Sequence, residues 1–241
     1  MVEESDLKQW RDAGHVARRT LEGIKGEIVE GKTWSEVIDS AERFIRRHGG
    51  QAAFPVTISV NNIAAHYTTS HADKPMEDWE SEMTFRNGDL VKLDVGAHIK
   101  GAIADNAMTI EVGSKGKHTD QIKAAKEARD AAIEKMHPGT PWYEIGAAAE
   151  QVTKDAGFEP IRNLCGHEME RWNLHAGLSI PMYACGKNNP GFKGVVEKGG
   201  IYAIEPFNTT GSSGMIENDS LLVLMPLLCQ EHLFLIYLKL L

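Results

Sequence analysis

Apolar residues recur at three- and four-residue intervals through the first fifty positions, which is the spacing of amphipathic helices. A first helix is predicted over residues 7–26, with its apolar face at Trp10, Ala13, Ala17, Leu21 and Ile24. A second is predicted from Thr33 to about residue 49. It starts with the Thr-Trp-Ser-Glu sequence of a capping box and stops at a pair of glycines.

A similar pattern returns in the second half of the chain. Residues 119–136 and 140–157 predict two more helices, the latter opening at Thr-Pro and closing at glycine. The second helix of each half begins beside a tryptophan, Trp34 or Trp142, and a Phe-containing extended segment follows it. This short match suggests two α/β halves related by duplication.

Apolar runs with the composition of strands occupy residues 54–60, 90–112 and 200–207. Strands that directly follow strands favour an α+β fold, with a largely antiparallel sheet backed by helices, over alternating βαβ units. Catalytic groups from several strands are then expected to face one cleft.

Composition narrows the range of functions. The 241 residues are 42% hydrophobic and carry a net charge of -8, which suits one compact domain or two closely packed halves. The acidic balance and the lack of a basic stripe argue against nucleic acid as a partner. Three unevenly spaced cysteines, Cys165, Cys185 and Cys229, indicate reduced thiols and a cytoplasmic protein.

The ends of the chain raise the question of a membrane. Residues 1–6 are acidic and do not have the pattern of a secretory signal. Residues 221–241 are apolar and long enough to span a bilayer, but they are interrupted by Pro226, Gln230, Glu231, His232 and Lys239. A buried strand pair or an altered carboxyl terminus is therefore favoured over a membrane anchor.

Two aspartates, Asp94 and Asp105, each close an apolar run within residues 90–105. A hairpin that turns at residues 99–100 places them opposite one another, with Cβ atoms about 5 Å apart. Because facing carboxylates repel, the pattern indicates a metal site, for a single ion or for two ions about 3.5–4 Å apart. Two solvated aspartates on a polar face are the alternative.

Other candidate ligands lie later in the chain. Glu205 follows an apolar run, so its carboxylate must be paired, protonated or metal-bound. His66, His167 and His175 are expected at strand ends or on irregular backbone, and each alone could be structural. One nitrogen and three oxygen ligands suit Mn, Fe, Co or Zn better than Ca. The set is Asp94, Asp105, His167 and Glu205.

Taken together, the motifs resemble type II methionine aminopeptidases of the archaeal kind. The resemblance extends over roughly residues 7–216 and is carried, in the same order, by residues 54–67, 92–98, 103–105, 166–177 and 202–207. It implies the pseudo-twofold pita-bread fold of the family, a mostly antiparallel curved sheet backed by helices. It also implies a dinuclear metal centre in the cleft between the halves.

The resemblance assigns roles to these side chains. Asp94 would chelate one ion, Asp105 would bridge both, and His167 and Glu205 would bind the second. The remaining histidines, His66 and His175, match those that contact the substrate and steady the tetrahedral intermediate.

The implied reaction removes the initiator methionine from nascent polypeptides. Two divalent cations (Co, Mn, Fe or Zn) would activate a bridging water, and Glu205 would shuttle its proton. Phe54, Ile63 and His66 are the expected walls of the methionine pocket. We expect a cytoplasmic monomer that acts on polypeptide amino termini close to the ribosome.

The sequence departs from the family near its end. The expected domain is residues 1–216. Residues 217–241 form a divergent apolar tail without the helical insertion of type II enzymes. The fifth ligand, a glutamate, has only Glu231 as a weak counterpart, and Glu168 puts a charge beside the metal where relatives have a small residue.

Two other functions stay open. One is a non-catalytic or impaired pita-bread protein that serves as a binding module. The other is an aminopeptidase P or prolidase-like peptidase, against which the sequences of residues 64–67 and 173–177 speak.

Overall fold

The computed structural model describes residues 4–69, 83–113, 116–187, 189, 192–212 and 214–216. The chain divides after His118 into two compact units, here called the N-terminal unit (Ser5–His118) and the C-terminal unit (from Thr119 onward). Each unit begins with a pair of helices and continues with strands, as the repeated sequence pattern suggested.

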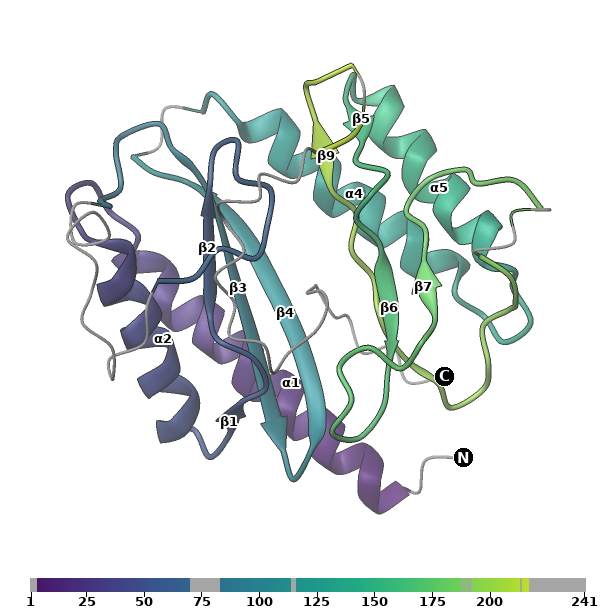
Figure 1. Cartoon of the computed structure of the whole chain (residues 1–241), viewed down its shortest axis with the longest axis horizontal. Helices are drawn as coiled ribbons and strands as arrows, with labels where there is room; N and C mark the ends of the chain where they lie inside the picture. The colour runs from purple at the N-terminus through teal and green to yellow at the C-terminus, as the bar shows by residue number, and fades with distance from the viewer. Residues whose placement is uncertain are drawn as a thin grey trace. The chain divides into compact units, whose positions relative to one another are not determined.

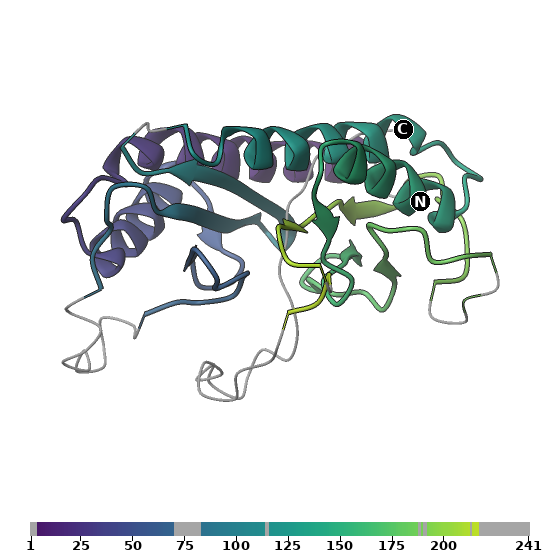
Figure 2. The same ribbon diagram turned by 90° about the horizontal axis from the view of Figure 1, so that it is seen from above.

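The N-terminal unit is built around one antiparallel sheet (Figure 1). Strand β3 is central: β1 and β2 pair with it on one side and β4 on the other. Helix α1 runs behind the sheet in Figure 1 and along one side of it in Figure 2, so it covers one face, and α2 lies next to β1 and β2. The elements are α1 (Glu4–Ile24), η1 (Lys25–Glu27), α2 (Trp34–Arg47), β1 (Gln51–Ala52), β2 (Thr57–Val60), β3 (Leu90–Ile99) and β4 (Ala102–Glu111).

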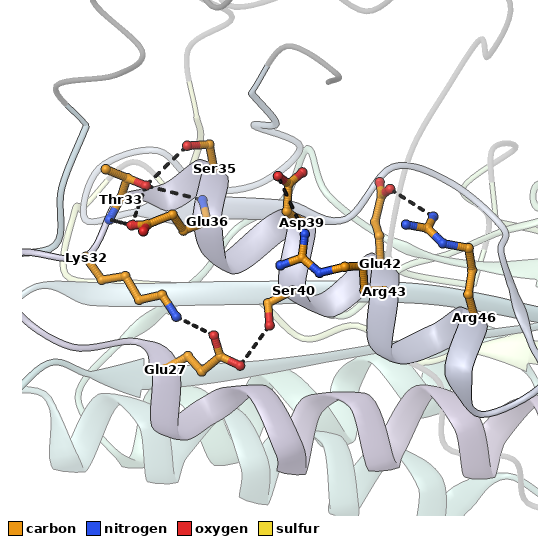
Figure 3. Close-up of polar contacts among 10 residues, drawn as sticks. All are labelled: Glu27, Lys32, Thr33, Ser35, Glu36, Asp39, Ser40, Glu42, Arg43 and Arg46. Carbon is orange, nitrogen blue, oxygen red and sulfur yellow. Dashed lines mark hydrogen bonds and ion pairs between the residues drawn. The ribbon is translucent and has the colours of Figure 1, made fainter. Parts of the chain in front are cut away.

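The predicted capping box at the start of α2 is confirmed (Figure 3). The Thr33 hydroxyl accepts a hydrogen bond from the Glu36 amide at 3.3 Å, and the Glu36 carboxylate accepts one from the Thr33 amide at 2.9 Å. Two amide donors that a helix start leaves without helical partners are thereby satisfied. Lys32 and Ser40 both donate to the Glu27 carboxylate, which joins η1 to α2.

Side chains alternate between the two faces of β3. Val91, Leu93 and Val95 are completely buried on one face and supply core packing. Lys92 and Asp94 project from the other face. One face of the sheet is thus apolar, and the other carries groups capable of chemistry.

The register of the β3–β4 hairpin differs from the prediction. Asp94 lies opposite Ala107 and Asp105 opposite Gly96, so the two aspartates are not directly opposed. The turn residues are Lys100 and Gly101, whose φ values of 51° and 83° suit a type I′ turn that glycine favours. Because the shift is by two residues, both aspartates keep the same face and become diagonal neighbours.

The C-terminal unit packs two helices against short antiparallel strands (Figures 1 and 2). Its core centres on Trp142, which contacts the Tyr202 ring edge-on at a centroid distance of 4.9 Å. Strands β7, β6 and β8 form one sheet, while β5 pairs with β9. The elements are α4 (Thr119–Lys135), α5 (Trp142–Asp155), β5 (Glu159–Pro160), β6 (Gly166–Met169), β7 (Ser179–Ile180), β8 (Ile201–Ala203) and β9 (Asn208–Thr209).

The observed elements confirm the α+β prediction, since helices precede antiparallel strands in both units. Within the described ranges, no helix is both long and apolar enough to cross a bilayer. Cys165 and Cys185 are free and only partly buried. The predicted tail, residues 217–241, lies outside the described residues, and so does Glu231.

Candidate metal centre

The N-terminal unit contributes two buried carboxyl groups. Asp94 is 3% exposed and Asp105 is completely buried. The pKa of Asp94 is raised well above its usual range, first by burial and then by the charge and hydrogen bond of Asp105. Two such groups cannot both be charged at low cost, so the pair calls for a shared proton or a cation.

A glycine brings an aromatic ring close to this acidic pair. Gly96 lies opposite Asp105 in the hairpin, and a Cβ on it would lie 2.3 Å from the nearest atom of the Phe54 ring. The ring of Phe54, which is 7% exposed, therefore packs directly on the strand. Its place on the carboxylate-bearing face is compatible with the predicted role as a pocket wall.

His66 lies in a loop next to the same sheet. Residues 61–66 connect β2 to Tyr67, whose carbonyl accepts a hydrogen bond from the Ile58 amide at 2.8 Å. The half-buried His66 has a φ of 68°, a left-handed conformation that costs free energy for a residue other than glycine. Contacts of the loop with the rest of the unit must therefore offset the free-energy cost of this backbone conformation at His66.

The C-terminal unit contributes an imidazole and a carboxylate. His167 in β6 pairs with Ala203 in β8, so Glu205, two residues further on, comes close to it. His167 Nε2 lies 3.1 Å from Glu205 Oε1, and the two residues are 4% and 0% exposed. The strands approach closely because Gly166 lacks a side chain: its Cβ would lie 2.3 Å from the Ala203 carbonyl oxygen.

The other nitrogen of His167 has a backbone partner. Nδ1 lies 3.3 Å from the carbonyl oxygen of Glu168. A carbonyl only accepts hydrogen bonds, so this contact suits a ring that carries a proton on Nδ1, and Nε2 is the nitrogen on the side of Glu205. Metal-binding histidines commonly have this arrangement. The contact between His167 Nε2 and Glu205 Oε1 is attractive when a proton or a metal cation lies between the two atoms.

His175 joins the same group. Its ring centroid lies 4.3 Å from that of His167, with the planes at 62°. The connection between them turns tightly at residues 171–172, where Glu170 and Asn173 exchange backbone hydrogen bonds of 2.9 and 3.1 Å. The short turn returns His175 to the ring of His167.

Glu168 does not project beside the metal ligand, contrary to expectation. Successive residues of a strand point to opposite faces, so Glu168 and His167 point apart within β6. The pKa of Glu168 is raised by burial and then by the charges of Glu170 and Glu197. Its acidic neighbours are therefore other glutamates.

The predicted ligands thus occur as two buried pairs, one in each unit. Both pairs bring together atoms that accept rather than donate hydrogen bonds, which suits a divalent cation. Carboxylate oxygens with an imidazole nitrogen form a donor set suited to first-row transition metals and zinc.

The sequence analysis did not single out Lys92, which projects from the same strand face as Asp94. Its position two residues before Asp94 was a usable signal, because such residues share a face of a strand.

Comparisons with known proteins identify the class. The profile of metallopeptidase family M24 matches residues 8–223, and the chain belongs to this family. It is 39% identical over 213 residues to a methionine aminopeptidase of Thermococcus onnurineus, covering 88% of this chain and 68% of that protein. A methionine aminopeptidase of Archaeoglobus fulgidus is 41% identical over 200 residues, covering 83% and 63%.

Solved structures agree. The crystal structure of a methionine aminopeptidase from Thermotoga maritima superposes with a TM-score of 0.75 at 26% identity, over 88% of this chain and 83% of that one. Prolidase from Pyrococcus furiosus, at 24% identity and a TM-score of 0.68 over 85% and 56% of the chains, shares the fold. The predicted family and pita-bread fold are confirmed, and the use of metal follows from membership of a metallopeptidase family.

Proposed function

We propose that this chain removes the amino-terminal methionine from newly made polypeptides. The observation that carries the proposal is the pair of buried acceptor clusters, Asp94 with Asp105 and His167 with Glu205. The family and the relatives named methionine aminopeptidase support the choice of reaction. The proposal includes two divalent cations as the cofactor that these residues bind.

The proposed metals are Co, Mn, Fe or Zn. When bound, two such cations would lower the pKa of water to give hydroxide near neutral pH and would polarise the scissile carbonyl. Imidazole and carboxylate ligands together favour these ions over Ca, which takes more oxygens.

The side chains divide the remaining work. Glu205 carries the proton from the attacking water toward the leaving amine, because its buried carboxylate can hold a proton. His175, in ring contact with His167, stabilises the developing oxyanion. His66 contacts the substrate, and Phe54 and Ile63 line the methionine pocket.

The proposed substrate is the free amino terminus of a nascent polypeptide. The protein is proposed to act as a cytoplasmic monomer near the ribosome. Methionine is preferred over proline-directed substrates because curated relatives at 39% and 41% identity are named methionine aminopeptidases, whereas the prolidase likeness is at 24% and concerns the fold.

The test is hydrolysis of a Met-Ala-Ser peptide during metal titration, with an Ala-Pro peptide as the control substrate. Asp105→Ala is expected to abolish methionine release, at least about a thousandfold, and to lower bound metal, since a ligand is lost. His175→Ala should reduce turnover while metal stays bound. Unchanged hydrolysis by Asp105→Ala, or cleavage of the proline peptide alone, would reject the proposal.

A further inference from the structure

A half-buried lysine projects from the same strand face as the acidic pair. Lys92 lies two residues before Asp94 in β3, and such residues share a face of a strand. Its Nζ donates a hydrogen bond of 2.9 Å to the carbonyl oxygen of Asn61. A charged group at the edge of the candidate site is therefore bonded to the loop that leads to His66.

The contact with Asn61 distinguishes lysine from an apolar residue at this position. Lys92 is half-buried. A methionine or leucine would fill a similar space but has no group that donates a hydrogen bond, so the bond to Asn61 is the distinctive contribution of lysine here.

Asn61 is the first residue of the loop, and every polar group of its backbone and side chain is engaged. Its amide donates to the Leu90 carbonyl at 2.8 Å, and its side-chain oxygen accepts from the Leu90 amide at 2.9 Å. Its side-chain nitrogen donates to Asp89 at 2.8 Å. The Asn61 carbonyl belongs to the peptide bond that leads into the loop, and it accepts the hydrogen bond from Lys92.

Both ends of the loop have left-handed backbone. Asn61 has a φ of 53° and His66 a φ of 68°. Such conformations persist where surrounding contacts impose them. At the far end those contacts come from Tyr67, which pairs with Ile58 and packs against Trp34 at 5.5 Å between ring centroids. At the near end the Lys92 ammonium bonds to the peptide unit from which the loop departs.

We propose that Lys92 is a positioning residue for His66. It fixes the Asn61 carbonyl and, through it, the path of residues 61–66, so that the imidazole of His66 is held ready for the substrate. The inference rests on the proposed function for the contact between His66 and substrate. The hydrogen bond between Lys92 and Asn61 is observed in the structure and does not depend on the proposed function.

The first test is a double-mutant cycle on Met-Ala-Ser hydrolysis. Lys92→Met keeps the length of the side chain and removes the donor, and it should lower kcat/KM about tenfold, as expected for a lost hydrogen bond from a charged group. Lys92→Arg should retain most of the activity. In a His66→Ala background, Lys92→Met should cause no further loss, because coupled residues are not additive.

The second test does not need activity. The His66 Cε1–H resonance is assigned by its absence from His66→Ala and compared between wild type and Lys92→Met by NMR. We expect it to shift or broaden, while the resonance of His15 in α1 stays in place and metal content is unchanged.

Additive losses in the cycle, or an unmoved His66 resonance, would overturn the inference. Failure of the wild type to cleave methionine peptides would instead reject the proposed function, and the NMR comparison would still decide the role of Lys92.

Discussion

The N-terminal unit holds its candidate ligands as two carboxyl groups on one face of a hairpin, whereas the C-terminal unit sets an imidazole beside a carboxylate. Asp94 and Asp105 become compatible when one of them is protonated, which leaves a pair with less charge. His167 and Glu205 carry at most one negative charge between them, because an imidazole ring is neutral or positive. Without metal, repulsion between the two carboxylates destabilises the folded N-terminal unit. The C-terminal pair has no such repulsion.

The positions of these ligands correspond nonetheless. Each unit has an isolated bridge just before its second helix, Thr33 with Thr84 and Pro141 with Val195. Asp94 follows Thr84 by ten residues, and Glu205 follows Val195 by the same number. Equivalent places in two similarly ordered units therefore carry carboxylates with different partners, which supports a duplication followed by divergence of the ligands.

The largest expected contrast is between Asp105→Asn and Glu205→Gln in metal-stripped protein. Both substitutions should abolish metal-dependent methionine release. Near neutral pH, Asp105→Asn should raise the melting temperature because it removes the charge that opposes Asp94. Glu205→Gln should change it less, because the amide that replaces the carboxylate can still hydrogen-bond to the His167 ring. Thermal unfolding in the presence of a chelator measures both.

The pH dependence gives this contrast a sign. Because the folded-state pKa of Asp94 is raised, its contribution to stability is complete below the unfolded pKa and is lost as pH rises through the folded one. The advantage of Asp105→Asn should therefore disappear toward about pH 4, near the ordinary pKa of aspartate. Asp12→Asn, at an exposed ion pair with Lys8, is the control. Equal shifts in both ligand variants would contradict the comparison.

The hairpin shows what sequence could and could not predict. Alternation alone placed Asp94 and Asp105 on one face of the hairpin. In a two-residue hairpin, an odd spacing puts both side chains on the same face, and a register shift of two residues does not change this. Their direct opposition was wrong because register depends on which two residues turn. Gly101, which suits a positive φ, was the overlooked signal.

The helices were predicted well because capping and apolar periodicity are local in sequence. The contact of His167 with Glu205 joins residues that are far apart in the chain, and its closeness depends on the β6–β8 pairing. Periodicity did not group these two residues: the ligand chemistry of their side chains did, and the family resemblance then assigned both to one ion. The bond from Lys92 to Asn61 likewise requires the structure, since no motif marks it.

Gly96→Ala changes the packing beside the acidic pair of the N-terminal unit and leaves the pair of the C-terminal unit as it is. The added Cβ would lie 2.3 Å from the nearest Phe54 ring atom, so the ring must move. We expect a destabilisation of about 1–3 kcal/mol, as for other overpacked sites. KM for Met-Ala-Ser should also rise if Phe54 walls the methionine pocket. Gly14→Ala in α1, where a Cβ meets nothing within 4 Å, is the matched control in denaturant unfolding.

The smallest expected effect compares how the second helix of each unit begins. Thr33 caps α2 through its side chain, whereas Pro141 makes no side-chain hydrogen bond at the start of α5. Thr33→Ala should therefore lower the free energy of unfolding by about 1 kcal/mol, which corresponds to a melting shift of about 2–4 °C. Thr140→Ala, next to Pro141, should change it by less than about 0.5 kcal/mol. Equal losses at both positions would show that the two helix starts do not differ in this way.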